Sequence, residues 1–168
     1  MATTSATAGQ PSNAARTKAA RTKQVIRIEG ALTTINRIIN GRATERLRSE
    51  RAGVFLARPR MRLLRALHDR GPMRIVDLGA INDMDKGYAS RTWRSLEADG
   101  YLQVVPGDDP RSITVALTPK GRELYLRWRQ ANTDLVSDTL VSWDEDDLDV
   151  LTDVLERLVI SLRELGRD

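Results

Sequence analysis

The chain has 168 residues, a formal net charge of +4, no cysteine and a single histidine, His68. The absence of cysteine excludes disulfides, thiol redox sensing and thiolate metal sites, and one histidine is too few for a zinc site or histidine-based catalysis. We expect no metal and no cofactor. No apolar run reaches the roughly 18 residues that a membrane span needs, and the start does not resemble a signal peptide, so we expect one soluble, cytoplasmic domain.

Charge is distributed unevenly along the chain. Residues 1–57 carry 10 Lys and Arg against 3 Asp and Glu, residues 58–122 carry 12 against 8, and residues 123–168 carry 5 against 12. The basic N-terminal and central parts indicate a surface that binds a polyanion, whereas the acidic C-terminal part is expected to face away from that partner.

The first segment, residues 1–24, is expected to be a flexible basic arm. It is rich in Ala, Thr, Ser and Gly and has few apolar residues, so it cannot offset the entropy of ordering. Such an arm could still touch phosphates without sequence preference. After it, Ile28, Leu32, Ile35 and Ile39 recur at helical spacing and predict a helix to about residue 51, with Gly41 as its weak point.

Three further helices follow. Pro59 suits the first turn of the next helix, and Gly71 with Pro72 ends it. A short helix over residues 74–80 leads to a break at 81–84. Asp85 is then the expected N-cap of a fourth helix that runs to about residue 99.

The next segment predicts a β-hairpin. Residues 101–105 and 112–117 alternate apolar and polar side chains, as half-buried strands do, and residues 107–111 form a charged loop between them. Together with the two preceding helices, this hairpin offers two surfaces. The apolar residues expected in the core are Ile75, Leu78, Trp93, Leu96, Leu102, Val104, Ile113 and Val115. The cations expected to point outward are Lys86, Arg91, Arg94 and Arg111.

Two helices are expected to close the chain. Thr118 and Pro119 open a fifth helix to about residue 140, and Ser142 with Glu145 suggests a capping box for the sixth. The last helix has leucines at a 3-4-3-4-3 spacing, which is the coiled-coil pattern. This seam consists of Leu148, Leu151, Leu155, Leu158, Leu162 and Leu165. Packing on the chain's own core is the alternative, but the spacing favours self-association.

The order of these elements resembles the MarR family of bacterial transcriptional regulators over about residues 25–166. The resemblance rests on several segments in the family's order and spacing. These are Leu63-Leu64-Arg65-Ala66-Leu67, Asp85-Lys86 with Ser90-Arg91, Leu96 to Leu102, Asp109-Pro110-Arg111-Ser112, and Leu117-Thr118-Pro119-Lys120-Gly121. Two departures are the basic run over residues 58–62 and the long N-terminal arm.

The resemblance implies a mainly α fold with a small β-wing. Residues 25–57 would form an N-terminal dimerisation helix region, residues 58–118 a winged helix-turn-helix, and residues 119–168 C-terminal dimerisation helices. It also implies a homodimer whose two lobes enter successive major grooves of a pseudo-palindromic operator, and release from DNA by a small, often aromatic, acid.

The expected DNA-binding residues lie on the fourth helix, at the wing and at the start of the third helix. They are Arg74, Lys86, Gly87, Tyr88, Ser90, Arg91, Arg94, Asp109 and Arg111. Arginine can pair with guanine through two hydrogen bonds, and Arg111 would enter the minor groove with Asp109 holding its side chain. The alternatives are an ordinary solvated face for the helix, a local turn brace for Asp109 and Arg111, and simple solvation for Arg74.

Three residues are candidates for effector binding. Arg37, Arg60 and Met61 fall on helices that line the pocket in this family, and an arginine there could bind a carboxylate. Dimer contacts or plain surface charge are the alternatives for these residues.

The leading hypothesis is therefore a sequence-specific, ligand-responsive regulator, namely a repressor released by a small aromatic acid. A constitutive or architectural DNA-binding dimer and a winged-helix protein-interaction module are the alternatives. An enzyme is not expected, because the sequence has no nucleophile–base set, glycine-rich phosphate loop or metal-ligand cluster.

Overall fold

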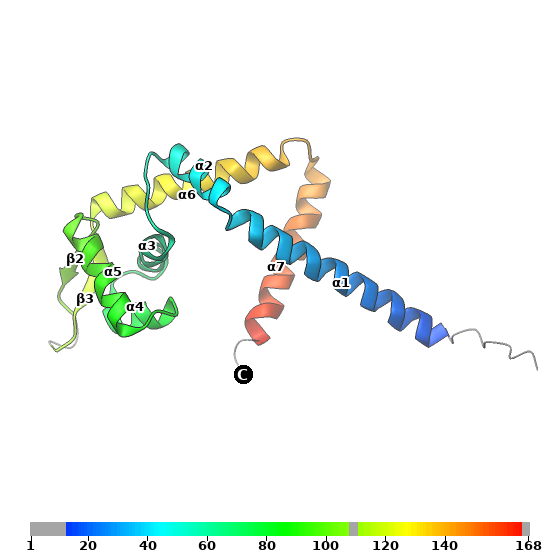
Figure 1. Ribbon diagram of the computed structural model, residues 1–168, viewed down its shortest axis with the longest axis horizontal. Helices are drawn as coiled ribbons and strands as arrows, with labels where there is room; N and C mark the ends of the chain where they lie inside the picture. Colours follow the sequence, from blue (N-terminus) through cyan, green and yellow to red (C-terminus); the bar gives the residue numbers. More distant parts are fainter. Residues whose placement is uncertain (1–12, 108–110, 166–168) are drawn as a thin grey trace, which may run out of the picture. The chain divides into compact units, whose positions relative to one another are not determined.

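The computed structural model describes residues 13–107 and 111–165, with side chains from Thr17 onward. These residues form seven helices and a three-stranded antiparallel sheet, which confirms the expected mainly α fold with a small β-wing (Figure 1). The elements are α1 (Asn13–Ile39), α2 (Arg42–Ala52), α3 (Arg58–Arg70), β1 (Met73–Arg74), α4 (Ile75–Ile81), α5 (Lys86–Ala98), β2 (Leu102–Val105), β3 (Thr114–Leu117), α6 (Pro119–Leu140) and α7 (Glu145–Leu165). The chain divides into two compact units at Leu47 and Arg48.

Helix α1 starts earlier than the sequence analysis expected. Residues 13–24, assigned to a flexible arm, are helical, while residues 1–12 of that arm lie outside the described residues. Alanine, arginine and lysine are strong helix formers, so this segment adopts a helix without an apolar face of its own. The expected weak point at Gly41 is confirmed, because α1 ends at Ile39 and a turn separates it from α2.

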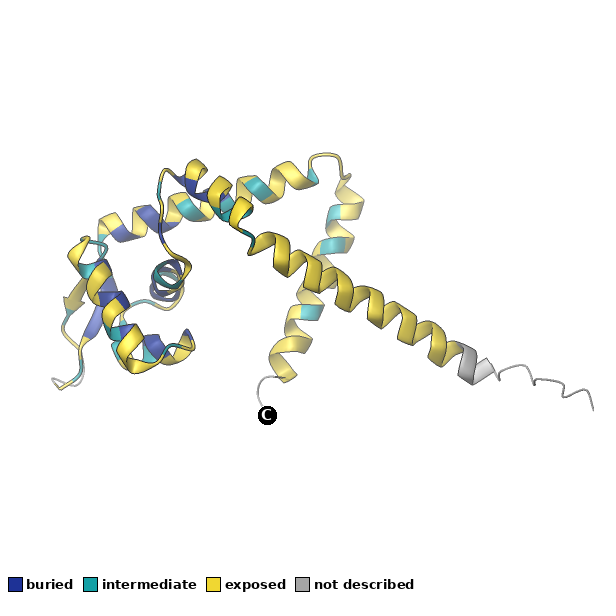
Figure 2. Ribbon diagram, in the orientation of Figure 1, coloured by how far each residue is buried: buried dark blue, intermediate teal, exposed yellow. Residues whose placement is uncertain are grey.

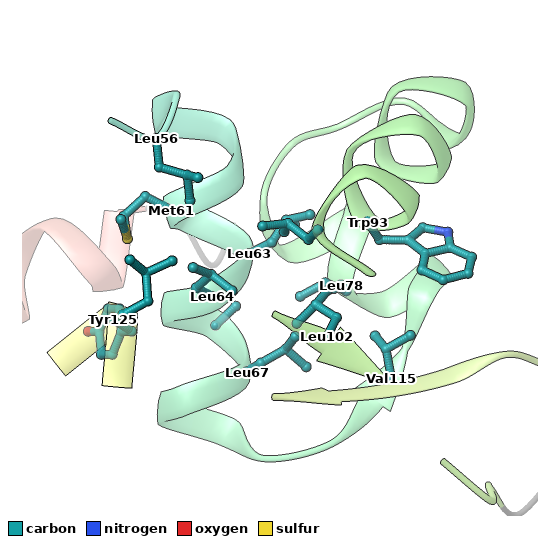
Figure 3. Packing of buried hydrophobic residues seen from close by; sticks show 13 residues of the cluster. Leu56, Met61, Leu63, Leu64, Leu67, Leu78, Trp93, Leu102, Val115 and Tyr125 are labelled. Carbon is teal, nitrogen blue, oxygen red and sulfur yellow. The ribbon is translucent and has the colours of Figure 1, made fainter. Parts of the chain in front are cut away.

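Helix α3 lies at the centre of the second unit. It packs against α4, α5, α6 and β3. Leu63 and Leu64 are completely buried. In Figure 3 they lie between Tyr125 of α6 and Trp93 of α5. The buried cluster consists of Leu56, Met61, Leu63, Leu64, Ala66, Leu67, Leu78, Trp93, Leu96, Leu102, Val115, Leu124 and Tyr125.

The sheet has the order β1-β3-β2, and its first strand was not expected. Met73 and Arg74 pair with Val115 and Thr114 of β3, but two residues are too short to show an alternating pattern. The expected β2 and β3 are present, with slightly shorter bounds.

Two residues expected in the core are exposed instead. Val104 is 53% exposed and Ile113 is 45% exposed, whereas Leu102 and Val115 are buried. Val104 lies on the edge strand β2, directly opposite the buried Val115 of the central strand β3, and Ile113 lies just before β3 on the side of the hairpin loop. Alternation along a strand predicts which face a side chain lies on, but not whether other elements pack over that face at its position.

The start of α6 is tied to the base of the hairpin. Thr118 is its N-cap as expected, and its Oγ1 accepts a hydrogen bond from the Gly121 amide at 3.0 Å and donates one to the Gly100 carbonyl at 2.7 Å. The Thr118 amide donates to the Tyr101 carbonyl at 3.1 Å. Gly121 passes so close to that carbonyl that a Cβ at this position would overlap it.

Helix α7 is capped by a different residue from the one expected. The Asp144 carboxylate, rather than the Ser142 hydroxyl, accepts from the Asp147 amide at 2.8 Å. Both residue types are good N-caps, so the local pattern alone did not separate them. No described residue of α7 is buried, and only Leu148, Leu151 and Leu158 of the seam are half-buried (Figure 2).

We expect the substitution Gly121→Ala to lower the free energy of unfolding by about 1–3 kcal/mol, because the added methyl group would collide with the Tyr101 carbonyl. Chemical denaturation measures this directly. The matched control is Gly30→Ala on α1, where a Cβ meets nothing within 4 Å and stability should be unchanged or slightly higher. Equal stability of the two variants would contradict the close approach.

Candidate nucleic-acid interface

Helix α5 has two distinct faces. Ala89, Thr92, Trp93 and Leu96 are buried, which confirms the face that the sequence analysis assigned to the core. The other face is open to solvent, apart from a half-buried Ser90. Its exposed members include Lys86, Gly87, Tyr88, Arg91 and Arg94. Burial of one side therefore fixes the direction in which the polar and cationic side chains point.

The N-terminus of α5 is built by a capped turn. The Asp85 carboxylate accepts a hydrogen bond from the Tyr88 amide at 2.8 Å, as expected of an N-cap. Before it, Asp83 has a positive φ of 53°, which reverses the chain between α4 and α5. The turn is anchored by Asn82, whose buried side-chain amide donates to the Leu78 carbonyl at 2.8 Å.

The first turn of α5 contains Gly87, which has no side chain, and the Arg91 guanidinium lies next to it. A Cβ on Gly87 would lie 3.4 Å from an Nη1 atom of Arg91, so the Arg91 guanidinium extends back toward the N-terminal end of the helix. This places the Arg91 guanidinium beside Gly87, in the half of the helix that a major groove would receive first. Arg94 instead lies beside Trp93, with its guanidinium carbon 5.8 Å from the ring centre.

A groove of about 500 Å³ runs between α4, α5 and the wing. Its walls combine apolar side chains, including Ile75, Met84 and Trp93, with cations. The cationic lining residues are Arg74, Lys86, Arg94 and Arg111. Hydroxyl groups of Ser90 and Ser112 complete the polar edge. The groove thus brings together five of the residues expected to bind DNA, namely the four cations and Ser90.

The surroundings of Arg74 include a well-defined ion pair, whereas those of Arg111 at the wing are described only in part. Arg111 is exposed at the end of the hairpin, but Asp109, expected to hold its side chain, lies outside the described residues. Arg74 makes a two-point ion pair with Asp77, with its Nε at 2.7 Å and its Nη2 at 3.0 Å from the two carboxylate oxygens. That pair holds the Arg74 guanidinium at the rim of the groove.

The three effector candidates have different local surroundings. Met61 is only 3% exposed and belongs to the core cluster. The Arg60 guanidinium contacts the Asp99 carboxylate on the segment after α5. Arg37 is exposed on α1, in the other compact unit.

A polar and aromatic cluster between α2, α3 and α6 was not predicted from the sequence. Arg48 is 5% exposed, its Nε donates to Asn132 at 3.0 Å, and its guanidinium lies 5.4 Å from the centre of the Trp128 ring. Tyr125 stacks on Trp128 and contacts the His68 ring. Burial, helped by the charge of a nearby carboxylate, raises the pKa of Tyr125 above that of an exposed tyrosine. The hydrophobic spacing of α2 gave no sign that a cation would be buried there.

Two other classes of site find no support in the described part of the chain. No three His, Asp or Glu side chains there are grouped so that they could hold a metal ion. None of the helices described is both long enough and apolar enough to cross a membrane.

Comparisons with known proteins agree with this geometry. Residues 56–113 match the model of the MarR family. A MarR family protein from Bacillus stearothermophilus has a TM-score of 0.75 and 16% identity, covering 84% of this chain and 96% of that one. A MarR-family transcriptional regulator from Silicibacter pomeroyi is 27% identical, with a TM-score of 0.57 and coverage of 78% and 88%. A probable transcriptional regulator from Pseudomonas aeruginosa is 25% identical, with a TM-score of 0.56 and coverage of 76% and 96%. No curated protein sequence matches the chain.

The helix-turn-helix followed by a β-wing defines a winged-helix DNA-binding protein. The family match covers residues 56–113, and most of the chain resembles solved structures of MarR-family proteins. The winged-helix region is therefore that of a DNA-binding transcription regulator. Regulators of this family bind DNA and act as dimers.

Proposed function

We propose that the chain binds a pseudo-palindromic operator as a homodimer and acts as a repressor that a small organic acid releases. The observation that carries the DNA-binding part is the two-faced α5, whose buried side fixes Lys86, Arg91 and Arg94 on its outer side. An exposed helix with a capped, cation-rich N-terminal half suits insertion into a major groove.

Each part of this surface has its own role in the proposal. Arg91 pairs with a guanine edge through two hydrogen bonds, because it extends toward the end of α5 that enters deepest. Lys86, Tyr88 and Ser90 contact phosphates or base edges beside it. Arg111, at the wing, reaches the minor groove, where a narrow groove attracts a cation.

The dimer in this proposal uses the uncovered leucine seam of α7. Leu155 is 43% exposed, Leu162 is 52% exposed and Leu165 is 76% exposed, although their spacing is that of a packed seam. A second copy of the chain supplies the missing cover, and symmetry then presents two copies of α5. Recognition helices about 34 Å apart engage half-sites one turn of DNA apart.

For the effector, we propose the groove between α4, α5 and the wing. Its apolar walls suit an aromatic ring, and Arg94 and Arg111 suit a carboxylate. Arg60 is less suitable, because its guanidinium is already engaged by Asp99. An acid in the groove would share cations with the DNA phosphates, so the two ligands would compete directly.

We expect Arg91→Ala and Arg111→Ala each to weaken operator binding by roughly 1–3 kcal/mol where the lost contact is to a base. A lost phosphate contact would weaken all sequences alike and reduce the dependence on salt. Fluorescence anisotropy with operator and scrambled duplexes at several salt concentrations distinguishes these cases. The control is Arg127→Ala on α6, whose exposed side chain pairs with Glu123. Operator binding by both variants at the wild-type level would exclude the proposed reading face.

We expect Leu155→Asp to convert the dimer to monomers, because a charge would be buried in the seam without a partner. Sedimentation velocity over a range of concentrations measures the change. The matched control is Thr152→Asp, which adds the same charge to α7 at an exposed position off the seam. A wild-type chain that sediments as a stable monomer would contradict the dimer and the two-half-site arrangement.

We expect a small aromatic acid, such as benzoate or salicylate, to release operator DNA in a competitive manner while the dimer stays intact. Amide NMR shifts in the DNA-free protein should then change around Gly79, Ser90 and Ser112, which line the groove. Changes confined to the surroundings of Arg37 and Met61 would place the effector elsewhere. Control of operator occupancy by peroxide or a metal ion instead would contradict an organic effector.

A further inference from the structure

The basic run at the start of α3, residues 58–62, makes contacts within the protein as well as adding positive charge to its surface. Arg60 and Arg62 leave this run toward two different parts of the helix-turn-helix. Arg60 reaches the C-terminal end of α5, and Arg62 reaches the turn between α4 and α5. The two arginines therefore contact the segment before α5 and the segment after it.

The contact of Arg60 is partly buried and has two acceptors. One Nη2 atom donates to the Ser95 carbonyl at 3.3 Å and also to the Asp99 carboxylate. The Arg60 side chain is 22% exposed, and its Nε is buried without a hydrogen-bond partner. A charged hydrogen bond at a site with restricted access to water is stronger and more directional than a surface ion pair.

The C-terminal end of α5 needs cations from elsewhere. The last turn of this helix has no basic residue, although its carbonyls form the negative end of the helix dipole and Asp99 adds a further negative charge. Arg60 from α3 neutralises this charge. Lys120 from α6 donates to the Asp99 carbonyl at 2.8 Å, and its ammonium lies 4.8 Å from the centre of the Tyr101 ring. Two neighbouring helices thus hold the end of α5.

The contact of Arg62 fixes the other end. Its Nη2 donates to the Asn82 carbonyl at 2.6 Å, in the turn where Asp83 takes a positive φ. Its ion pair with Asp83 is longer, 3.8 Å, and that carboxylate is 93% exposed. The hydrogen bond to the Asn82 carbonyl is therefore the stronger of the two contacts of Arg62 with the turn. Because Asn82 itself is buried, Arg62 connects α3 to a fixed part of the turn.

We propose that Arg60 and Arg62 are positioning residues for DNA recognition. They set the tilt of α5 from α3, while the α5 side chains make the contacts with bases. This inference rests on the proposed function, in which α5 enters the major groove. A helix held only by its apolar face could rotate slightly about Leu96, and a small rotation displaces the guanidinium of Arg91 from a base edge.

The decisive variant is Arg60→Gln. We expect operator affinity to fall about tenfold, because the charged contact with Asp99 is lost. The slope of log affinity against log salt should stay at the wild-type value, because no phosphate contact is removed. Arg65→Gln is the matched control, since the Arg65 guanidinium faces Asp69 on its own helix at 3.5 Å. A reduced salt slope in Arg60→Gln would mean that Arg60 touches phosphate directly, and would overturn the proposal.

Exchanging the charges of Arg60 and Asp99 tests whether their contact, rather than either residue alone, maintains operator affinity. Arg60→Asp combined with Asp99→Arg reverses the pair and also suits both helix dipoles, with an acid in the first turn of α3 and a cation at the end of α5. We expect the double variant to recover most of the affinity that Arg60→Asp alone loses. Affinity no higher than that of the single variant would overturn the brace. If Arg60→Gln does not fold, Asp99→Ala at its half-exposed position should give the same loss.

Arg62→Gln should weaken operator binding less than Arg60→Gln, again without a change in salt slope. Wild-type affinity in both glutamine variants would overturn the proposal. The proposed function is tested separately by Arg91→Ala. Loss of binding in Arg91→Ala with wild-type binding in the Arg60 and Arg62 variants removes only the positioning role. Wild-type binding in Arg91→Ala and Arg111→Ala removes the reading face itself.

Discussion

Leu96 of α5 is completely buried in the cluster that surrounds α3, and this contact determines which side of α5 faces outward. Trp93 and Ala89 extend the same buried stripe. The cations of the outer side follow from this constraint, because a helix with one side in the core can present only the other. A core of leucines from several elements therefore does more than stabilise the unit. It gives the reading surface its orientation.

Local patterns in the sequence were sufficient for most of the fold. The N-caps Asp85 and Thr118, the break at Gly41 and the buried stripe of α5 were all predicted, because each depends on residues a few positions apart. The resemblance to the MarR family supplied the arrangement of these elements, which the family match supports. The cationic outer residues of α5 followed from helical periodicity once the buried stripe was assigned.

The remaining features depend on contacts between distant residues. Strand β1 exists only through its pairing with β3, and the exposure of Val104 depends on its place in the edge strand β2. Arg60 and Asp99 lie 39 positions apart, so no local pattern joins them. Arg48 has a sequence setting like that of other surface arginines, yet it is buried against Trp128. Residues 13–24 differ from the expectation for another reason, because their strong helix propensity forms a helix despite their low hydrophobicity.

The contact between Gly121 and the Tyr101 carbonyl has a mechanical consequence. It joins the first turn of α6 to the base of the hairpin, so a displacement of this end of α6 would carry the wing with it. A helix of 22 residues is about 33 Å long, and pivoting it by about 5° at the Leu140 end would swing the base of the wing through about 3 Å. That sweep is comparable to the separation of neighbouring base pairs along the duplex. A small angular change at one end of α6 would thus be transmitted as a shift of roughly one step along the DNA.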